Sequence, residues 1–373
     1  MRRNITWYNF CMPSFVVQTR PRGYPVLVAP GALAALSEHL SKGAGKIFVV
    51  TTADVWRLHG AKVAAPLEGR AYEVLIFPGG EERKRLSELE ALAEQMVARG
   101  GDRTSIVVAF GGGIVNDLGG FLAATFMRGV PVIQAPTTLL AQVDAGVGGK
   151  TGVNLASGKN LVGAFHQPLA VLIDPDVLET LPEREYRAGL YEALKTAVIR
   201  SAKLFRLMVE ERERILRLDP AIVTEMVAQS VEIKAEVVSA DERESDLRRI
   251  LNFGHTIGHA VEAETAYSRL LHGEAVAFGM RAATHLAHLA GCLNAASRDE
   301  ILRAITMYGP IPSLEGIRAP NLVARLARDK KTIQGKIHFV LPNAVGVVKV
   351  VSGLGEGVVL EATETALAEL AAA

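Results

Sequence analysis

Three histidines in residues 251 to 276 are the side chains whose spacing most directly suggests chemistry. His255 and His259 are four residues apart, so in a helix they would share one face. Neutral imidazole is the commonest metal ligand, and a pair at this spacing can hold one ion. The alternative is a helix with two polar residues in its core. The third histidine, His272, favours a metal or acid–base site, because the chain has only nine.

Charged and polar residues lie close in sequence to these histidines. Lys195 follows Glu192 by three residues, on one face of an expected helix. Further polar residues precede His255, namely Lys234, Glu244, Arg248 and Asn252. Each of them, taken singly, is better explained as a solvated surface residue. Together they indicate a site that captures an anionic substrate.

A glycine-rich loop marks the first half of the chain. The apolar run that ends at Phe110 is followed by Gly111, Gly112 and Gly113, and then by the sequence Ile114-Val115-Asn116-Asp117. Glycines in such a turn let the backbone approach a phosphate, and the N-terminus of a following helix favours an anion. A tight structural turn is the alternative, since this is not the GxGxxG pattern.

Two more polar loops follow expected strands, and their number favours a nucleotide site. One contains Thr137 and Thr138, and the other spans residues 148–152, Gly-Gly-Lys-Thr-Gly. Residues 78–84 follow a further strand, where they either contact a ribose or form a solvated charged turn. Because ligands of parallel sheets bind at the carboxyl ends of the strands, these loops are expected to meet.

The elements that must carry these loops alternate between strands and helices. Strands are expected at 24–29, 46–51, 72–77, 105–110, 130–135 and 170–174, with amphipathic helices between several of them, such as 85–99. This alternation predicts βαβ units and a mostly parallel sheet of the α/β class over residues 1–182.

Helical periodicity dominates after residue 182 and predicts an α-helical domain over 183–373. Helices are expected at 188–208, 221–240, in the histidine stretch and at 274–290. Residues 337–341 and 345–351 look extended, with a turn expected at Leu341-Pro342-Asn343. The cleft between two such domains is the usual place for a substrate.

Composition limits the class of protein. With 373 residues and 49% hydrophobic residues, the chain can build a large core without disulfides. A formal net charge of +1 gives no indication of a nucleic-acid or membrane partner. Cys11 and Cys292 form no ligand motif, and Asn4, Asn9 and Pro13 interrupt the N-terminal apolar residues, which excludes a signal peptide. A reducing, cytoplasmic setting is expected.

Several long motifs make the chain similar to the 3-dehydroquinate synthase family. They are GGGIVNDLGGFLAATFMRG, PTTLLAQVDAGVGGKTGVN, GKNLVGAFHQP, LIDPDVLETLPEREY, KAEVVSADERES, LNFGHTIGH and LHGEAV, in the family's order between about residues 16 and 351. The resemblance implies a Rossmann-like domain, a helical C-terminal domain, NAD+ and one divalent metal ion, zinc before cobalt. It also implies conversion of 3-deoxy-D-arabino-heptulosonate 7-phosphate to 3-dehydroquinate and phosphate.

The resemblance assigns roles residue by residue. The metal ligands it implies are Glu192, His255 and His272, in place of the His255–His259 pair suggested by spacing. The catalytic residues implied are His259, Asn252, Lys150, Lys195 and Asp144. Substrate contacts are implied for Asn160, Lys234, Glu244, Arg248 and Lys331, and for Arg128, which in the family reaches the neighbouring subunit of a homodimer. Cofactor contacts are implied for Glu81, Lys84, Gly112, Gly113, Ile114, Val115, Asn116, Asp117, Thr137, Thr138, Lys150, Lys159 and Thr180.

Two departures from the family pattern stand out. Asn116 replaces a common glycine, and because asparagine tolerates a left-handed backbone the loop is expected to keep its conformation. Residues 52–54, Thr-Ala-Asp, replace a more usual arrangement at an adenosine-ribose contact. The rival interpretations are another sugar phosphate cyclase, a metal-dependent polyol or glycerol-phosphate dehydrogenase that releases NADH, and a non-catalytic NAD-binding scaffold. The chain keeps the implied metal ligands, lysines and histidines, and this argues against the scaffold.

Overall fold

The computed structural model describes residues 13–372 apart from 20–21, 42, 245 and 329–336, and the chain divides into two compact units. The first unit holds residues 1–182 and 216–243, and the second holds 183–215 and 244–373. The boundary after residue 182 lies where the sequence placed it, but residues 216–243 differ from the expected domain 183–373. The reason is helix α7 (Pro220–Ala240), which packs its apolar side chains against β1 and β2 of the first unit.

A seven-stranded sheet organises the first unit, and all its neighbouring strands are parallel except the β1–β2 pair. The six expected strands are confirmed, while β1 was not foreseen. In spatial order the strands are β1 (Ser14–Val17), β2 (Tyr24–Val28), β9 (Ala170–Ile173), β6 (Val132–Pro136), β5 (Ile106–Gly111), β3 (Ile47–Thr51) and β4 (Tyr72–Ile76).

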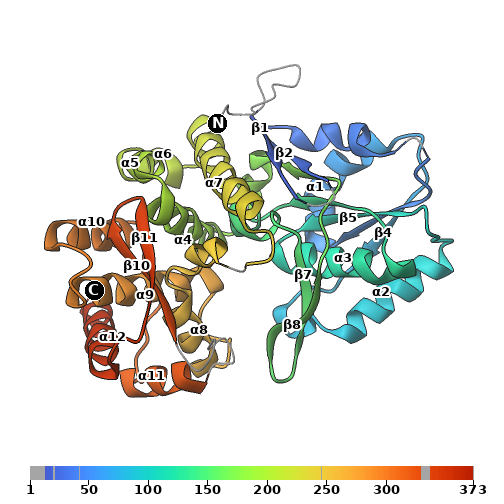
Figure 1. Ribbon diagram of the computed structural model, residues 1–373. Coiled ribbons are helices and arrows are strands. Elements are labelled where there is room, and N and C mark those ends of the chain that lie inside the picture. The colour runs from blue at the N-terminus through green and yellow to red at the C-terminus, as the bar shows by residue number, and fades with distance from the viewer. Residues whose placement is uncertain (1–12, 20–21, 42, 245, 329–336, 373) are drawn as a thin grey trace. The chain divides into compact units, whose positions relative to one another are not determined.

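Helices cover both faces of this sheet, because successive residues of a strand point to opposite sides. Val108 of β5 packs in one apolar cluster with Leu33, and Val107 packs in a second cluster with Leu118. The elements behind the first cluster include η1 (Ala32–His39), α1 (Ala53–Ala64) and η2 (Ala65–Leu67), and those behind the second are α2 (Leu86–Ala98) and α3 (Gly113–Thr125) (Figure 1). This two-faced cover confirms the α/β class.

A hairpin of β7 (Lys150–Leu155) and β8 (Gly158–Phe165) follows the sheet strand β6. The prediction of a polar loop at 148–152 is therefore partly wrong. Gly148 and Gly149 have positive φ and precede the strand, but residues 150–152 belong to β7. Because of its glycines the segment resembled a loop, although it forms strand β7, whose Val153 is buried against α3. Short helical turns complete the unit: η3 (Glu81–Arg83), η4 (Phe126–Arg128), η5 (Ala141–Ala145) and η6 (Pro175–Thr180).

The second unit is helical and carries one small hairpin, as expected. Its central helix is α9 (His272–Leu289), buried along 273–287, and α4, α8, α10 and α12 all pack against it. The other elements are α4 (Glu183–Arg200), α5 (Ala202–Glu210), α6 (Arg212–Leu216), η7 (Leu247–Asn252), α8 (His255–Glu264), α10 (Ala295–Thr306), α11 (Ala319–Arg328), β10 (His338–Ala344), β11 (Val347–Ser352) and α12 (Glu356–Ala371).

Two expected boundaries in this unit are wrong. The helix expected at 188–208 is broken at Ser201, whose hydroxyl accepts a hydrogen bond from the Leu204 amide at 3.1 Å and so starts a new helix. The turn expected at Leu341-Pro342-Asn343 lies later, because Pro342 still pairs with Val348 and the chain reverses at Gly346, where φ is 85°. Among the described residues, no helix is long and apolar enough to cross a membrane.

Candidate functional site

The glycine-rich loop in the first unit lies at the carboxyl end of β5, as the sequence predicted. Gly112 precedes helix α3 in an extended conformation, and no side chain among the described residues caps this helix end. The first amides of a helix have no partner within the helix, and they carry the positive end of its dipole. The start of α3 can therefore bind an anion such as a phosphate.

The threonine loop after β6 lies directly against this glycine loop. The Thr137 amide donates to the Gly111 carbonyl at 2.9 Å. A Cβ on Gly112 would lie 2.9 Å from Cγ2 of Thr138, so a larger residue would force Thr138 to move. The neighbouring positions of β5 and β6 in the sheet bring the two loops together, as expected.

Lys84 is the centre of a polar cluster that joins three segments of the first unit. Its ammonium donates to Asp117 Oδ2 at 2.5 Å and to Asn160 Oδ1 at 2.6 Å, and its side chain is only 3% exposed. Burial raises the pKa of Asp117, and the positive charge of Lys84 opposes that rise. Asn160 has a left-handed backbone with φ of 53°. Three implied site residues are thus in direct contact.

Asn154 completes this cluster and was missed at the sequence level. Its side chain donates to Glu81 Oε1 at 2.7 Å and accepts from the Asn160 amide at 2.8 Å, and its own amide donates to the Lys84 carbonyl. The sequence feature that could have identified Asn154 is its position in the VNLASGKN segment, between the glycine loop and Lys159. A single polar residue within a strand gave no reason to select it.

Asn116 corrects an expectation about the backbone. It lies inside helix α3 and not in a left-handed conformation, and it is 1% exposed. Its side-chain Nδ2 donates to the Ala109 carbonyl of β5 at 3.0 Å, and its own carbonyl accepts from Gln134 at 3.1 Å. The asparagine therefore ties the helix to the sheet.

The remaining implied residues of the first unit are spread over several elements. Lys234 of α7 contacts the carbonyl and the carboxylate of Asp144. Thr180 bonds to His59 of α1 at 2.7 Å and donates to the Val177 carbonyl at 3.3 Å. Lys150 and Lys159 lie on β7 and β8, Arg128 is exposed in η4, and Ile114 and Val115 lie in the first turns of α3.

Residues 52–54 do not resemble a preformed ribose contact. The Thr52 hydroxyl accepts from the Val55 amide at 3.4 Å and caps helix α1. Asp54 pairs with Arg57 at 3.4 Å, and both side chains are largely exposed. The departure noted in the sequence has thus produced an ordinary helix start.

The histidines of the second unit lie together because helices α8 and α9 approach very closely. A Cβ on Gly279 would lie 1.9 Å from the Gly254 carbonyl, and one on Gly273 would lie 1.9 Å from the Ala188 carbonyl of α4. Glycine at these positions brings three helices into backbone contact. As a result His255, His259 and His272 each offer a ring nitrogen within 4.8 Å of the others.

Glu192 of α4 joins this cluster from the third helix. Its side chain is fully buried, and Oε1 lies 3.8 Å from Nε2 of both His255 and His272. No donor among the described residues makes a hydrogen bond to that oxygen. The other oxygen, Oε2, lies 2.5 Å from the Lys195 ammonium. Two 2.1 Å bonds to a tetrahedral ion separate their donor atoms by about 3.4 Å, so the three side chains fit such an ion.

The ring nitrogens of two histidines have distinct partners. Nδ1 of His255 lies 3.2 Å from the Phe253 carbonyl, and Nδ1 of His272 lies 3.4 Å from both oxygens of Glu262. Since these oxygens accept, each Nδ1 carries a hydrogen, and the neutral form of each ring then has its lone pair on Nε2. Burial, aided by Lys195, lowers the pKa of His255 well below its ordinary value, so the ring is neutral.

Glu262 was not predicted as a site residue, although the sequence holds a signal for it. It lies seven residues after His255 and three after His259, so all three share one face of α8. It is also 2% exposed, which is unusual for a carboxylate.

The segment before α8 holds the other implied residues of the second unit. The Asn252 side chain donates to Glu244 Oε1 at 2.8 Å, with Glu244 in a left-handed conformation at φ of 59°. Arg248 lies in η7 and is 2% exposed. Lys331 lies outside the described residues.

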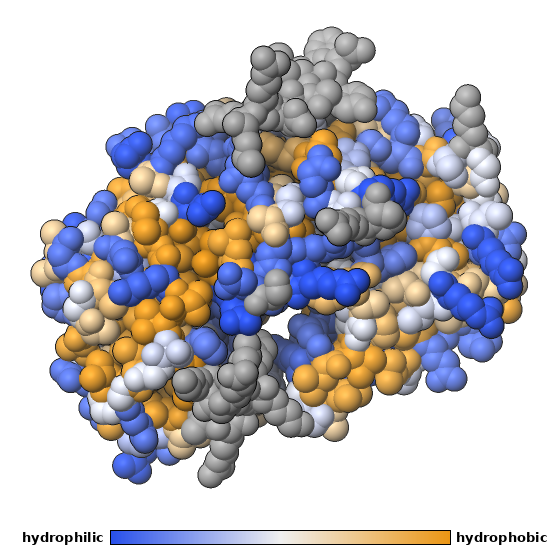
Figure 2. All heavy atoms as spheres, in the orientation of Figure 1, coloured by the Kyte–Doolittle hydropathy of each residue, from blue (hydrophilic) through white to orange (hydrophobic). Residues whose placement is uncertain are grey.

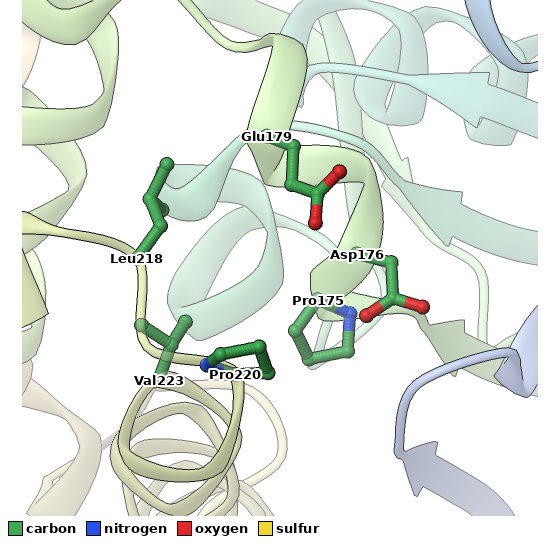
Figure 3. A pocket seen from close by; sticks show the side chains of 6 residues that line it. All are labelled: Pro175, Asp176, Glu179, Leu218, Pro220 and Val223. Atoms are coloured by element: carbon green, nitrogen blue, oxygen red, sulfur yellow. The ribbon is translucent and has the colours of Figure 1, made fainter.

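A separate depression on the first unit lies between η6 and the start of α7. Figure 3 shows its lining residues, Pro175, Asp176, Glu179, Leu218, Pro220 and Val223. None of the implied site residues lines it. Burial raises the pKa of Asp176, and the neighbouring Asp174 adds to that rise. The depression offers two carboxylates and no cation, so it does not suit an anionic substrate.

The chain was compared with known proteins. Residues 74–188 match the family model of the 3-dehydroquinate synthase N-terminal domain, and residues 189–332 match that of its C-terminal domain. The 3-dehydroquinate synthase of Solibacter usitatus (strain Ellin6076) is 60% identical over 357 residues, covering 96% of this chain and 100% of the relative. That of Koribacter versatilis (strain Ellin345) is 47% identical over 93% of this chain and 96% of the relative.

Solved structures of other cyclases are similar over nearly the whole chain. The 2-epi-5-epi-valiolone synthase of Streptomyces hygroscopicus subsp. jinggangensis 5008, with NAD+ and Zn2+ bound, is 32% identical, with a TM-score of 0.85 over 95% of this chain and 98% of that one. A 2-deoxy-scyllo-inosose synthase, complexed with carbaglucose-6-phosphate, NAD+ and Co2+, has a TM-score of 0.84 over 94% and 99%. At 24% identity, the second likeness concerns the fold alone.

Proposed function

The chain belongs to the 3-dehydroquinate synthase family, and from this premise we propose that it converts 3-deoxy-D-arabino-heptulosonate 7-phosphate to 3-dehydroquinate and phosphate. The observation that carries the proposal is the 60% identity to a 3-dehydroquinate synthase over its full length. The compact set of Glu192, His255 and His272 supports it independently, because a non-catalytic scaffold has no need of a carboxylate and two imidazoles that converge on one point.

Glu192, His255 and His272 would hold one divalent ion, with zinc preferred over cobalt. Two neutral imidazoles and one carboxylate are a ligand set typical of catalytic zinc, and three protein ligands leave positions for substrate oxygens. A bound ion would polarise the hydroxyl to be oxidised, and NAD+ would accept the hydride and return it, so that no net oxidation remains. Lys195 Nζ, 2.5 Å from Glu192 Oε2, orients the carboxylate from its other side.

NAD+ would bind in the first unit. The start of α3 at Gly112 and Gly113 suits the pyrophosphate, because the glycine leaves room and the helix amides point outward. Thr137 and Thr138 adjoin this loop. Asp117 is held in place by Lys84 and can accept from a ribose hydroxyl. Glu81 and Lys159 are the other residues that support this location.

The substrate carries both a phosphate and a carboxylate, and the implied cations match that charge. Lys150, Lys195, Lys234 and Arg248 would bind these groups, since a buried anion is costly without partners. Arg248, with its planar donor fork, suits a carboxylate or phosphate best. His259 is not needed as a ligand and would hold or return a proton at a ring nitrogen. Asn252, whose side chain is held by Glu244, would assist it.

One assay separates this function from its rivals. Purified enzyme with zinc and a trace of NAD+ should release phosphate from the heptulosonate phosphate without accumulating NADH. Steady accumulation of NADH would indicate a dehydrogenase. The likeness to a 2-epi-5-epi-valiolone synthase makes a sister cyclase the second candidate. Sedoheptulose 7-phosphate tested in competition, with products identified by mass, should be a poor substrate, and comparable turnover would overturn the proposal.

We also propose that the chain forms a homodimer in the cytoplasm, with Arg128 reaching the partner's site. Exposed apolar side chains on the β7–β8 hairpin support an interface there, because Leu161 is 49% exposed and Phe165 is 48% exposed. Figure 2 shows apolar areas beside hydrophilic ones on one face of the molecule. His166, after β8, bonds to the Val130 carbonyl at 2.9 Å, so the hairpin and η4 adjoin.

Mixing two inactive variants tests the shared site. Arg128→Ala protein and His255→Ala protein, once subunits have exchanged, should regain part of the activity, because each hybrid dimer contains one intact site. Absence of rescue despite measured subunit exchange would contradict the role of Arg128. A monomeric mass by light scattering would contradict the dimer itself.

A further inference from the structure

We propose that Glu262 is a positioning residue for the metal site, which holds the His272 ring so that its Nε2 faces the ion. The inference rests on the proposed role of His272 as a ligand. No family motif quoted above assigns a role to Glu262.

The geometry places the carboxylate behind the imidazole. Both oxygens of Glu262 lie 3.4 Å from Nδ1 of His272, while Nε2 of the same ring lies 3.8 Å from Glu192 Oε1. One nitrogen thus faces the proposed ligand Glu192, and the other faces a carboxylate. Glu262 is 2% exposed and belongs to α8, whereas His272 starts α9.

The position of the His272 backbone is set by contacts other than the one with Glu262. Glu274 accepts from the Leu271 amide at 2.8 Å and is itself held by Arg184 at 2.7 Å. These bonds set where α9 begins, but they do not restrict rotation of the His272 side chain. The His272 side chain is also 32% exposed, so packing alone constrains it less than His255, which is 11% exposed.

The chemistry explains why a carboxylate is placed there. A carboxylate accepts the Nδ1 hydrogen, selects the tautomer with a lone pair on Nε2, and increases the basicity of that nitrogen. His255 obtains the same tautomer from the Phe253 carbonyl. The two ligands therefore share one orientation and differ in the strength of the acceptor behind them. Loss of such an outer partner typically weakens metal binding by about 10-fold to 100-fold.

The experiment measures zinc affinity by competition with a chelator in the full-length protein at one pH. Glu262→Leu, which removes the acceptor, should weaken zinc binding by about 10-fold to 100-fold. Glu262→Gln keeps the shape and a neutral acceptor, so a loss of about threefold to tenfold is expected. Circular dichroism and thermal melting of the metal-free proteins establish that each variant is folded, and Glu262→Gln carries the test if Glu262→Leu does not fold.

Glu264 provides a matched control on the same helix. It pairs with Arg325 and accepts from Asn321 at 3.0 Å, so Glu264→Gln removes a carboxylate of α8 without altering the partner of His272. Zinc affinity should stay within about twofold of the parent. An equal loss in both variants would mean that general disturbance of α8, and not the contact with Nδ1, weakens the site, and would overturn the proposal.

A double-mutant cycle separates this proposal from the metal assignment. His272→Ala should weaken zinc binding strongly, and adding Glu262→Leu to it should cost nothing further. If His272→Ala leaves zinc affinity unchanged, the ligand assignment fails. If His272→Ala weakens binding while both Glu262 variants match the parent, only the positioning role fails. Nitrogen NMR of the metal-free parent should show Nδ1–H on His272, and that tautomer should be lost in Glu262→Leu.

Discussion

The two units build their candidate sites from different parts of the chain. In the first, the start of α3 offers backbone amides, and a Cβ on Gly112 would press against Thr138. In the second, side chains from α4, α8 and α9 converge, and glycines serve only to bring the helices close. The first site depends on backbone amides that small residues leave accessible. The second depends on the nitrogen and oxygen atoms of its side chains.

This difference predicts how each site responds to substitution. A backbone site tolerates changes in nearby side chains, since its donors belong to the main chain. A site of buried ligands does not, because each nitrogen and oxygen has one role and a removed charge leaves its partner unpaired. The following changes test that contrast, from the largest expected effect to the smallest.

Removal of a metal ligand should have the largest effect. His255→Ala and Glu192→Gln should each lower kcat/KM by about 1000-fold or more, because loss of the ion removes several kcal/mol of charge stabilisation. Metal content by mass spectrometry should fall in both. His259→Ala should lose rate but keep its metal. A metal-free His259→Ala protein with a metal-replete Glu192→Gln protein would mean that the three histidines are the ligand set.

Loss of the buried arginine should have the next largest effect. Arg248→Ala should lower kcat/KM on the heptulosonate phosphate by about 100-fold or more, since removal of one partner of a buried charged pair costs about 2–5 kcal/mol. Steady-state kinetics at saturating NAD+ measure this. The neighbouring Arg249→Ala is the control, because the resemblance implies no substrate contact for Arg249. Similar losses in both variants would show that activity depends on the positive charge of this segment in general, and not on Arg248 in particular.

A change in the first unit should have a moderate effect. Asp117→Ala should raise the Kd for NAD+ by about tenfold, because it removes one charged hydrogen-bonding group while the α3 amides remain. Calorimetry measures this. Asp102→Ala, at the opposite end of β5, removes a carboxylate that bonds to Thr104 and should leave the Kd unchanged. An unchanged Kd in Asp117→Ala would place the cofactor elsewhere.

The smallest effect on binding is expected where the chain departs from its family. Asn116→Gly should leave NAD+ affinity within about twofold, yet lower the free energy of unfolding by about 1–2 kcal/mol. The loss combines the poor helix propensity of glycine with a lost hydrogen bond to Ala109. Chemical denaturation followed by circular dichroism gives the stability. A tenfold loss of NAD+ affinity would instead make Asn116 part of the binding site.

Much of the fold was predictable because it follows local patterns. The six sheet strands are short apolar runs bounded by turn residues, and the long helices repeat apolar side chains at helical spacing, so both emerged from residue order. Strand β7 did not, because its glycines resemble a loop and its burial depends on contact with α3. Helix α7 was recognised as a helix, but its packing on the first unit is a tertiary property.

By itself, the sequence determined the class of fold, the glycine and threonine loops at the strand ends, and the presence of a histidine-rich site. The tertiary structure decided which atoms meet. Only the close approach of α4, α8 and α9 places Glu192 Oε1 at 3.8 Å from two Nε2 atoms and Glu262 behind His272. The physical reason is that hydrophobic periodicity specifies which face of a helix is buried, whereas backbone distances between helices, set here by glycines, decide which polar atoms on those faces come into contact.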